Sequence, residues 1–144
     1  MIPNTTLINA LRSVADKMIK KGSQPAEYQW NWHLEEHCNC GLLARELGAS
    51  VPLILNEVNS YWSTSLSSKI NSNSYQICST TGLPNTTLFS FLGSFGLTYT
   101  DFEELEFVGT QDYILGSNQH RQFVINYFLN KANELESQLL TNNE

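Results

Sequence analysis

The sequence predicts an all-α fold: one compact domain over residues 1–144, built from five to seven helices of unequal length. Apolar residues recur at helical spacing in several segments, and no segment shows the strict alternation typical of a half-buried strand. Glycine and proline fall between these segments, where helices commonly end and begin. The chain of 144 residues has an ordinary length for one domain, and no long linker or internal repeat divides it.

The first predicted helix is amphipathic and begins close to the N-terminus. Asn4, Thr5 or Thr6 can accept hydrogen bonds from its first N–H groups, and Gly22 can end it before Pro25. Its apolar residues recur at helical spacing and are Leu7, Leu11, Val14 and Met18, joined by Ile8, Ala15 and Ile19. The stretch that follows has no clean period, and we expect an ordered loop held by aromatic side chains.

A short helix is predicted from Cys40 to Leu47, after this loop. Asn39 is its predicted N-cap, and Gly48 is placed to end it. Its inward residues are expected to be Leu42, Leu43 and Leu47. A further helix opens near residue 52 and either continues to about residue 70 or gives way to a Ser/Asn-rich loop.

Two more helices are predicted before the last one. The first runs from Pro84 to Phe95, and its core residues are Leu88, Phe91, Leu92 and Phe95. The second begins at a capping box, in which Thr100 bonds the third backbone N–H and Glu103 reaches back, and it ends at Gly109. Acidic residues gather at its start, where the helix dipole favours them and water solvates them. Residues 110–115 are expected to add one or two turns.

The last predicted helix spans about residues 117–140. Its inward stripe is Val124, Tyr127, Phe128, Leu135 and Leu139. Residues 141–144 are expected to fray.

The charge of the chain is unevenly distributed. The net charge is −6; residues 1–72 carry six basic and six acidic side chains, whereas residues 73–144 carry two and eight. Without a cluster of Lys and Arg, nucleic acid is not an expected partner. No apolar run approaches the ~20 residues of a membrane span, and the N-terminus has no secretory signal pattern. Three cysteines, an odd number, favour a reducing compartment, so we expect a cytoplasmic protein.

Residues 33–41, "HLEEHCNCG", concentrate chemically active side chains. His33, His37, Cys38 and Cys40, together with the distant Cys78, supply five candidate zinc ligands. The spacing is not that of the familiar structural zinc sites, which use two well-separated pairs. "HLEEH" also matches a zinc-peptidase pattern, but its flanks do not resemble the long helix that such enzymes need.

Two other interpretations of the cysteines stay open. If Cys40 lies at a helix start, the helix dipole would stabilise its thiolate, and His33 or His37 could act as a base. Cys40 is therefore the candidate reactive thiol. Alternatively, Cys38, Cys40 and Cys78 are core residues, because buried cysteine packs as a small apolar group.

Several segments, taken in order, resemble a family of small uncharacterised bacterial proteins. They are "YQW", "CNCG" opening a short helix, "CSTTGLP", "FEELEFVGTQDYIL" and a final long helix. The most specific are "CNCG" and the later Cys-x-Thr-x-Gly-like element. The resemblance implies a bacterial protein and no assigned reaction, cofactor or partner. It also favours a single spatial cluster of Cys38, Cys40 and Cys78.

The working hypothesis is that Cys38, Cys40 and Cys78 converge with His33 or His37 near the start of the short helix. Such a thiolate-rich site would bind a transition metal, such as zinc, or sense redox state. The alternative is a non-catalytic interaction module with structural cysteines. Its aromatic loop and acidic half would face another protein or a second copy of the chain.

Overall fold

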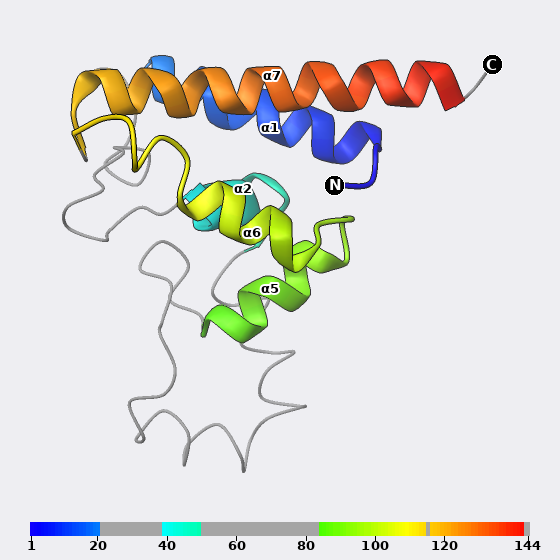
Figure 1. Cartoon of the computed structure of the whole chain (residues 1–144). Coiled ribbons are helices and arrows are strands. Elements are labelled where there is room, and N and C mark those ends of the chain that lie inside the picture. The colour runs from blue at the N-terminus through cyan, green and yellow to red at the C-terminus, as the bar shows by residue number, and fades with distance from the viewer. Residues whose placement is uncertain (21–38, 50–83, 115, 143–144) are drawn as a thin grey trace, which may run out of the picture.

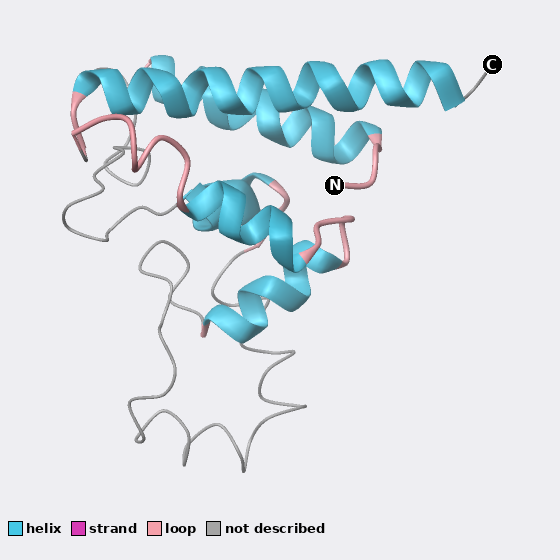
Figure 2. Ribbon diagram, in the orientation of Figure 1, coloured by secondary structure: helices cyan, strands magenta, loops and turns pink. Residues whose placement is uncertain are grey.

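The computed structural model describes residues 1–20, 39–49, 84–114 and 116–142. These residues contain five helices and no strand, in the order α1 (Thr5–Ile19), α2 (Asn39–Glu46), α5 (Asn85–Gly93), α6 (Tyr99–Glu106) and α7 (Asn118–Asn142) (Figures 1 and 2). This content confirms the predicted all-α class for the described part. None of its helices is both long and apolar enough to cross a membrane. The helix predicted near residues 52–70 lies outside the described residues.

The first and last helices form an antiparallel pair. α1 packs along α7, and the two ends of the chain lie toward the same end of this pair (Figure 1). Arg12 on α1 lies 2.8 Å from the Glu136 carboxylate on α7. At the other end, Arg121 donates a hydrogen bond to the carbonyl of Met18. That carbonyl belongs to the last turn of α1, where the helix itself provides no donor and a cation is favoured by the dipole.

The three shorter helices lie on one side of this pair. α2 packs against α1, α5 and α6, and it therefore joins the long pair to the rest of the described fold (Figure 1). Lys17 Nζ lies 2.5 Å from Glu46 Oε1, and the Ser13 hydroxyl donates to the same carboxylate at 2.9 Å. The end of α2 is thus fixed to α1 by polar contacts beside the apolar ones.

The core between the helices is dominated by leucine. Its largest fully buried side chains are Phe128, Leu7, Leu11, Met18, Leu42, Leu43, Leu88, Leu92, Leu105 and Ile125. Each such burial stabilises the fold by roughly 1.5–3 kcal/mol. The predicted apolar stripe of α1 is confirmed except at Ile19, in the last turn, which is 57% exposed. On α7 the prediction is confirmed for Val124, Phe128 and Leu135, whereas Tyr127 and Leu139 are only half-buried.

Asn4 begins α1 and also ties it to the connection between α5 and α6. Its side-chain oxygen accepts the Leu7 N–H at 2.8 Å, so Asn4 is the N-cap among the three predicted candidates. Its amide nitrogen donates to the Phe95 carbonyl at 3.0 Å. Beside it, the Ile2 N–H donates to the Gly96 carbonyl at 2.8 Å. The N-terminal segment is therefore bonded to residues more than ninety positions away.

The predicted capping box at Thr100 and Glu103 is wrong, because the motif lies two residues earlier. Thr98 is the N-cap of α6: its hydroxyl accepts the Asp101 N–H, and Asp101 Oδ2 accepts the Thr98 N–H at 2.7 Å. Tyr99 and Thr100 are already helical. A shorter aspartate at the third position therefore takes the role that the pattern assigned to a glutamate.

The end of α7 also differs from the prediction. Residues 141–144 were expected to fray, but the helix continues through Thr141 and Asn142. The Thr141 hydroxyl donates to the Ser137 carbonyl at 2.9 Å, one turn back along the same helix. After α6, residues 107–113 form hydrogen-bonded turns rather than a helix, including one from the Tyr113 N–H to the Gly109 carbonyl.

Candidate functional site

The candidate site begins at the first turn of α2, where Cys40 lies. The helix ends as its sequence predicts: Gly48 has φ +99°, the left-handed conformation that glycine adopts most easily. The Ala49 N–H bonds the Ala44 carbonyl and the Gly48 N–H bonds the Arg45 carbonyl, which is a complete Schellman motif. Leu42 and Leu43 are buried as predicted, and they hold the first turn of α2 against the core.

The first turn of α2 is attached to α6 by three polar contacts. The Asn39 amide donates to the Leu105 carbonyl at 2.8 Å, and the Cys40 N–H lies 3.4 Å from a Glu106 carboxylate oxygen. The Cys40 Sγ lies 3.8 Å from the Phe102 carbonyl oxygen, in position to donate a weak hydrogen bond. Cys40 is a thiol and only 1% of its surface is exposed. Its sulfur therefore faces the α6 backbone rather than solvent.

The prediction that Asn39 caps α2 is wrong. Asn39 already belongs to the helix, and its side chain extends across to α6. A fully buried amide must satisfy its donors within the protein, and the Leu105 carbonyl is within reach. The Asn39 side chain thus links α2 to α6 by a hydrogen bond and does not cap its own helix.

Four of the five predicted ligands cannot be located. His33, His37, Cys38 and Cys78 lie outside the described residues, so their convergence with Cys40 stays a prediction. Within the described residues, no group of three or more His, Cys, Asp or Glu side chains is arranged to hold a metal ion. The zinc site and the reactive role of Cys40 stay predictions from the sequence.

Tyr127 lies near Cys40, at the junction of α6 and α7. Its hydroxyl oxygen is buried, and the Glu104 carboxylate of α6 lies close enough to act on it. Burial, and then the negative charge of Glu104, raise the pKa of Tyr127 above its ordinary value, so the phenol stays neutral. Lys131 Nζ lies 5.8 Å from the centre of the Tyr127 ring and 3.6 Å from Glu104 Oε1. The ammonium thus lies near both an aromatic ring and a carboxylate.

His120 is a buried polar residue that sequence reasoning missed. Its Nε2 lies 2.7 Å from the Val108 carbonyl oxygen and its Nδ1 accepts the Gly116 N–H at 3.1 Å, so its partners favour the neutral tautomer protonated at Nε2. It thereby joins α7 to the turns that follow α6. Its spacing in the sequence indicates that it faces inward, because His120 lies four residues before Val124 and eight before Phe128, on the same stripe of the helix.

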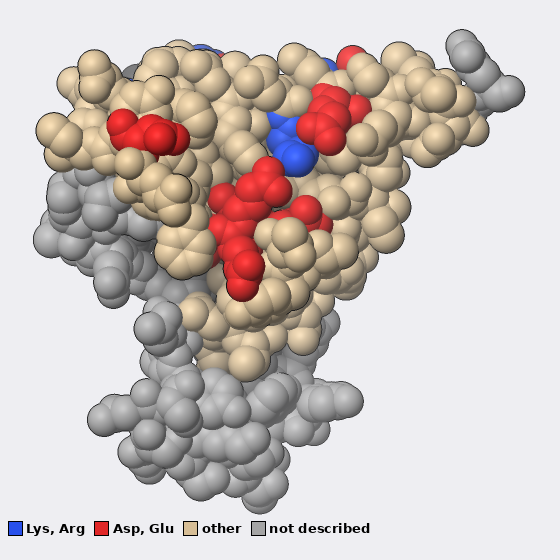
Figure 3. Space-filling view, viewed as in Figure 1, with Lys and Arg blue, Asp and Glu red and all other residues tan. Residues whose placement is uncertain are grey.

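The outward side of α6 carries two exposed aromatic residues beside acidic ones. Tyr99 and Phe107 are 66% and 65% exposed, although both are large and apolar. Glu103 is exposed between them and makes no ion pair with any described residue. In the space-filling view, acidic side chains gather over this part of the molecule, with a basic side chain beside them (Figure 3). We call the side that carries Tyr99, Glu103 and Phe107 the outward face of α6.

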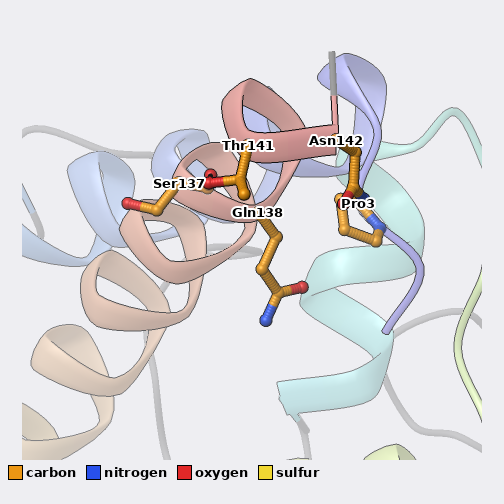
Figure 4. Close-up of a pocket in the computed structure, with 5 residues that line it drawn as sticks. All are labelled: Pro3, Ser137, Gln138, Thr141 and Asn142. Carbon is orange, nitrogen blue, oxygen red and sulfur yellow. Dashed lines mark hydrogen bonds between the residues drawn. The ribbon is translucent and has the colours of Figure 1, made fainter. Parts of the chain in front are cut away.

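A shallow open groove lies where the N-terminus meets the end of α7. It is lined by Pro3, Ser137, Gln138, Thr141 and Asn142 (Figure 4). None of these side chains is ionisable, and the Gln138 amide donates to the Glu134 carboxylate at 3.4 Å. The groove offers no acid, base or nucleophile of ordinary catalytic strength.

No protein-family model, curated protein or solved structure matches this chain. The resemblance drawn from "CNCG" and "CSTTG" stays a prediction, and the second of these motifs lies outside the described residues.

Proposed function

We propose that the chain is a non-catalytic protein-interaction domain, that the outward face of α6 is its docking surface, and that Cys40 is a packing residue. The observation that carries the proposal is the exposure of Tyr99 and Phe107, each about two-thirds open to solvent. Large aromatic side chains are enriched at the centres of protein interfaces, and exposed apolar groups gathered on one face mark such surfaces.

The two aromatic residues share a face because of their spacing. Successive residues of an α-helix are rotated by about 100°, and Phe107, the C-cap of α6, still bonds the Glu103 carbonyl through its N–H. Tyr99, Glu103 and Phe107 therefore fall within an arc of about 80°. Phe102 and Leu105 lie outside this arc and are buried in the core. Tyr99 meets the Phe89 ring of α5 edge-on, with 6.2 Å between the ring centroids, but two-thirds of its surface stays exposed, as does that of Phe107. Both residues therefore keep open ring surface in the described fold.

The burial of Cys40 supports a structural role for its thiol. Reactive thiols lie in partly exposed, electropositive surroundings, whereas buried structural thiols are inert. Cys40 is 1% exposed, and its Sγ faces the Phe102 carbonyl, with the Glu106 carboxylate near its own N–H. Metal analysis tests the thiolate-site hypothesis separately, because a bound site predicts close to one metal ion per chain in the purified protein.

Site-specific photo-crosslinking in the source cell tests the interaction role. A photoreactive phenylalanine analogue is placed at Glu103, on the outward face of α6, and a matched one at Asn126, an exposed residue of α7. We expect discrete crosslinked products from position 103 and fewer from position 126. If position 103 gives no product above that of position 126, α6 is not a docking surface.

Thiol reactivity gives the second half of the test. We expect Cys40 in the folded protein to react with iodoacetamide far more slowly than in urea, because the reagent cannot reach a buried sulfur. Peptide mapping assigns the modified cysteine. Rapid alkylation of Cys40 in the folded protein would contradict the structural role.

A further inference from the structure

We infer that the outward face of α6 binds a cationic segment of a partner protein, in which Lys or Arg residues alternate with apolar ones. This inference rests on the proposed interaction role of α6 and adds the chemistry of the partner. It is drawn from the charge of the face, from its aromatic side chains, and from an arrangement that the protein already contains at the junction of α6 and α7.

The charge of the face is negative and is only partly compensated. Glu103 is exposed without an ion pair in the described part of the chain, and residues 84–120 contain no Lys or Arg at all. Among the described residues, Lys131 compensates part of this charge: its Nζ lies 3.6 Å from Glu104 and 3.6 Å from Glu134. A cationic partner is therefore attracted to this face, and complementary charge of this kind speeds association and selects among partners.

The aromatic residues further restrict the chemistry of the partner segment. Tyr99 and Phe107 flank Glu103, so a Lys or Arg placed against Glu103 would also lie close to an aromatic ring. The ring faces attract cations, Arg more often than Lys. Apolar residues of the partner would cover the remaining ring surface. A purely apolar partner would leave Glu103 buried without a counter-charge, which is unfavourable.

An intramolecular contact already shows this chemistry. The Lys131 ammonium is 5.8 Å from the centre of the Tyr127 ring and 3.6 Å from Glu104. A lysine of this chain therefore lies close to one aromatic ring and one α6 carboxylate. The outward face of α6 offers rings and a carboxylate in the same way, but no lysine or arginine of the described residues is paired with Glu103.

Other occupants fit the face less well. A second copy of the chain docked through the same face would bring Glu103 and its neighbours against the same acidic side chains, which repel. Nucleic acid and anionic lipid surfaces carry the same sign of charge as the face. The partner that matches both the rings and the carboxylates is a protein segment with positive charge.

Peptide binding to the purified full chain tests the inference. The probe is a fluorescein-labelled peptide of repeated Leu-Lys-Lys-Leu, compared with its Leu-Glu-Glu-Leu counterpart, and binding is followed by fluorescence anisotropy. We expect the lysine peptide to bind and the glutamate peptide not to bind. Affinity for the lysine peptide should fall as salt rises, because the contributing charges lie on the surface.

Paired variants separate docking on α6 from general attraction to an acidic protein. Tyr99→Ser with Phe107→Ser should weaken binding about tenfold, whereas Leu140→Ser, at an equally exposed apolar residue of α7, should not. Glu103→Gln should weaken binding about threefold. Asp16→Asn, which removes one exposed charge from α1, should change it less. Circular dichroism establishes that each variant is folded.

Three results would overturn the inference. These are equal binding of both peptides, unchanged binding to the double serine variant, and equal effects of Glu103→Gln and Asp16→Asn. A different result would overturn the inference and leave the proposed interaction role intact. It is a protein crosslinked at position 103 that has no basic segment at the crosslinked site, or a crosslinked product that is a second copy of this chain.

Discussion

Gly96→Ala tests how the N-terminal segment is held against the connection between α5 and α6. Gly96 has φ +107°, and a Cβ added there would lie 2.9 Å from the Ile2 Cβ and 3.3 Å from the Ile2 backbone nitrogen and oxygen. The Ile2 N–H also donates to the Gly96 carbonyl, so the two backbones cannot separate without weakening that bond. Gly48→Ala is the matched control, because Gly48 has φ +99° and an added Cβ there meets nothing within 4 Å.

The expected losses follow from these two geometries. Both substitutions place an L side chain at positive φ, at a cost of about 1–2 kcal/mol. Only Gly96→Ala adds an overlap with Ile2, and overpacking of this kind costs about 1–3 kcal/mol more. We therefore expect Gly48→Ala to lose about 1–2 kcal/mol and Gly96→Ala about 2–5 kcal/mol of unfolding free energy.

Urea unfolding followed by circular dichroism measures both losses. Near the midpoint, each lost kcal/mol also lowers Tm by about 3–4 °C in a chain of this size. Ile2→Gly in the Gly96→Ala background removes the overlapping Cβ and should restore part of the loss, since Ile2 itself is largely exposed. Equal losses for the two alanine variants would refute the reasoning, and so would a double variant no more stable than Gly96→Ala.

Three further predictions concern buried polar contacts. Asn39→Ala should cost about 1–3 kcal/mol in urea unfolding, because the Leu105 carbonyl loses its donor in a buried site; a loss near zero would contradict this. His120→Phe should cost about 1–3 kcal/mol in thermal unfolding, because the buried Val108 carbonyl loses its donor, whereas the exposed Gly116 N–H can bond water. His120→Ala would separate this effect from poor packing of the larger ring. Asp101 gives a pH dependence. Burial raises its pKa, but hydrogen bonds from Thr98 and the Met1 amine outweigh burial and lower the pKa below its ordinary value. A lowered folded pKa means that the carboxylate stabilises the fold above its unfolded pKa, and that this stability is lost as the pH falls through the folded pKa. Stability measured from pH 7 downward should therefore fall less steeply below about pH 4 in Asp101→Asn than in the parent chain, and parallel curves would contradict the assignment.

The helices with the strongest periodicity were predictable from the sequence. The inward faces of α1 and α2 follow from leucines at helical spacing, and Gly48 marks the end of α2 where the sequence places it. These features depend on residues within one or two turns of each other, so the local sequence contains the information. The same holds for Leu88 and Leu92 on α5.

The polar residues of the candidate site were harder to assign. Asn39 was interpreted as a local cap, yet its partner is the Leu105 carbonyl, sixty-six residues away. His120 received no role, although it bridges α7 to the preceding turns. A buried amide or imidazole bonds whichever backbone group the fold brings near, and that choice depends on how helices pack. Sequence periodicity can mark such a residue as inward, but it cannot identify its partner.

For this protein, the sequence by itself determined the helical class, the apolar faces of the first and last helices, and the acidic character of the C-terminal half. The tertiary structure alone decided that the Cys40 thiol faces the Phe102 carbonyl inside the core. It also decided that Tyr99 and Phe107 stay exposed beside Glu103. The physical reason is that periodicity records which face of a helix is apolar, whereas burial of a given side chain depends on which neighbouring helix covers it. On α6 the core takes Phe102 and Leu105, and the two outer aromatic residues remain open to solvent.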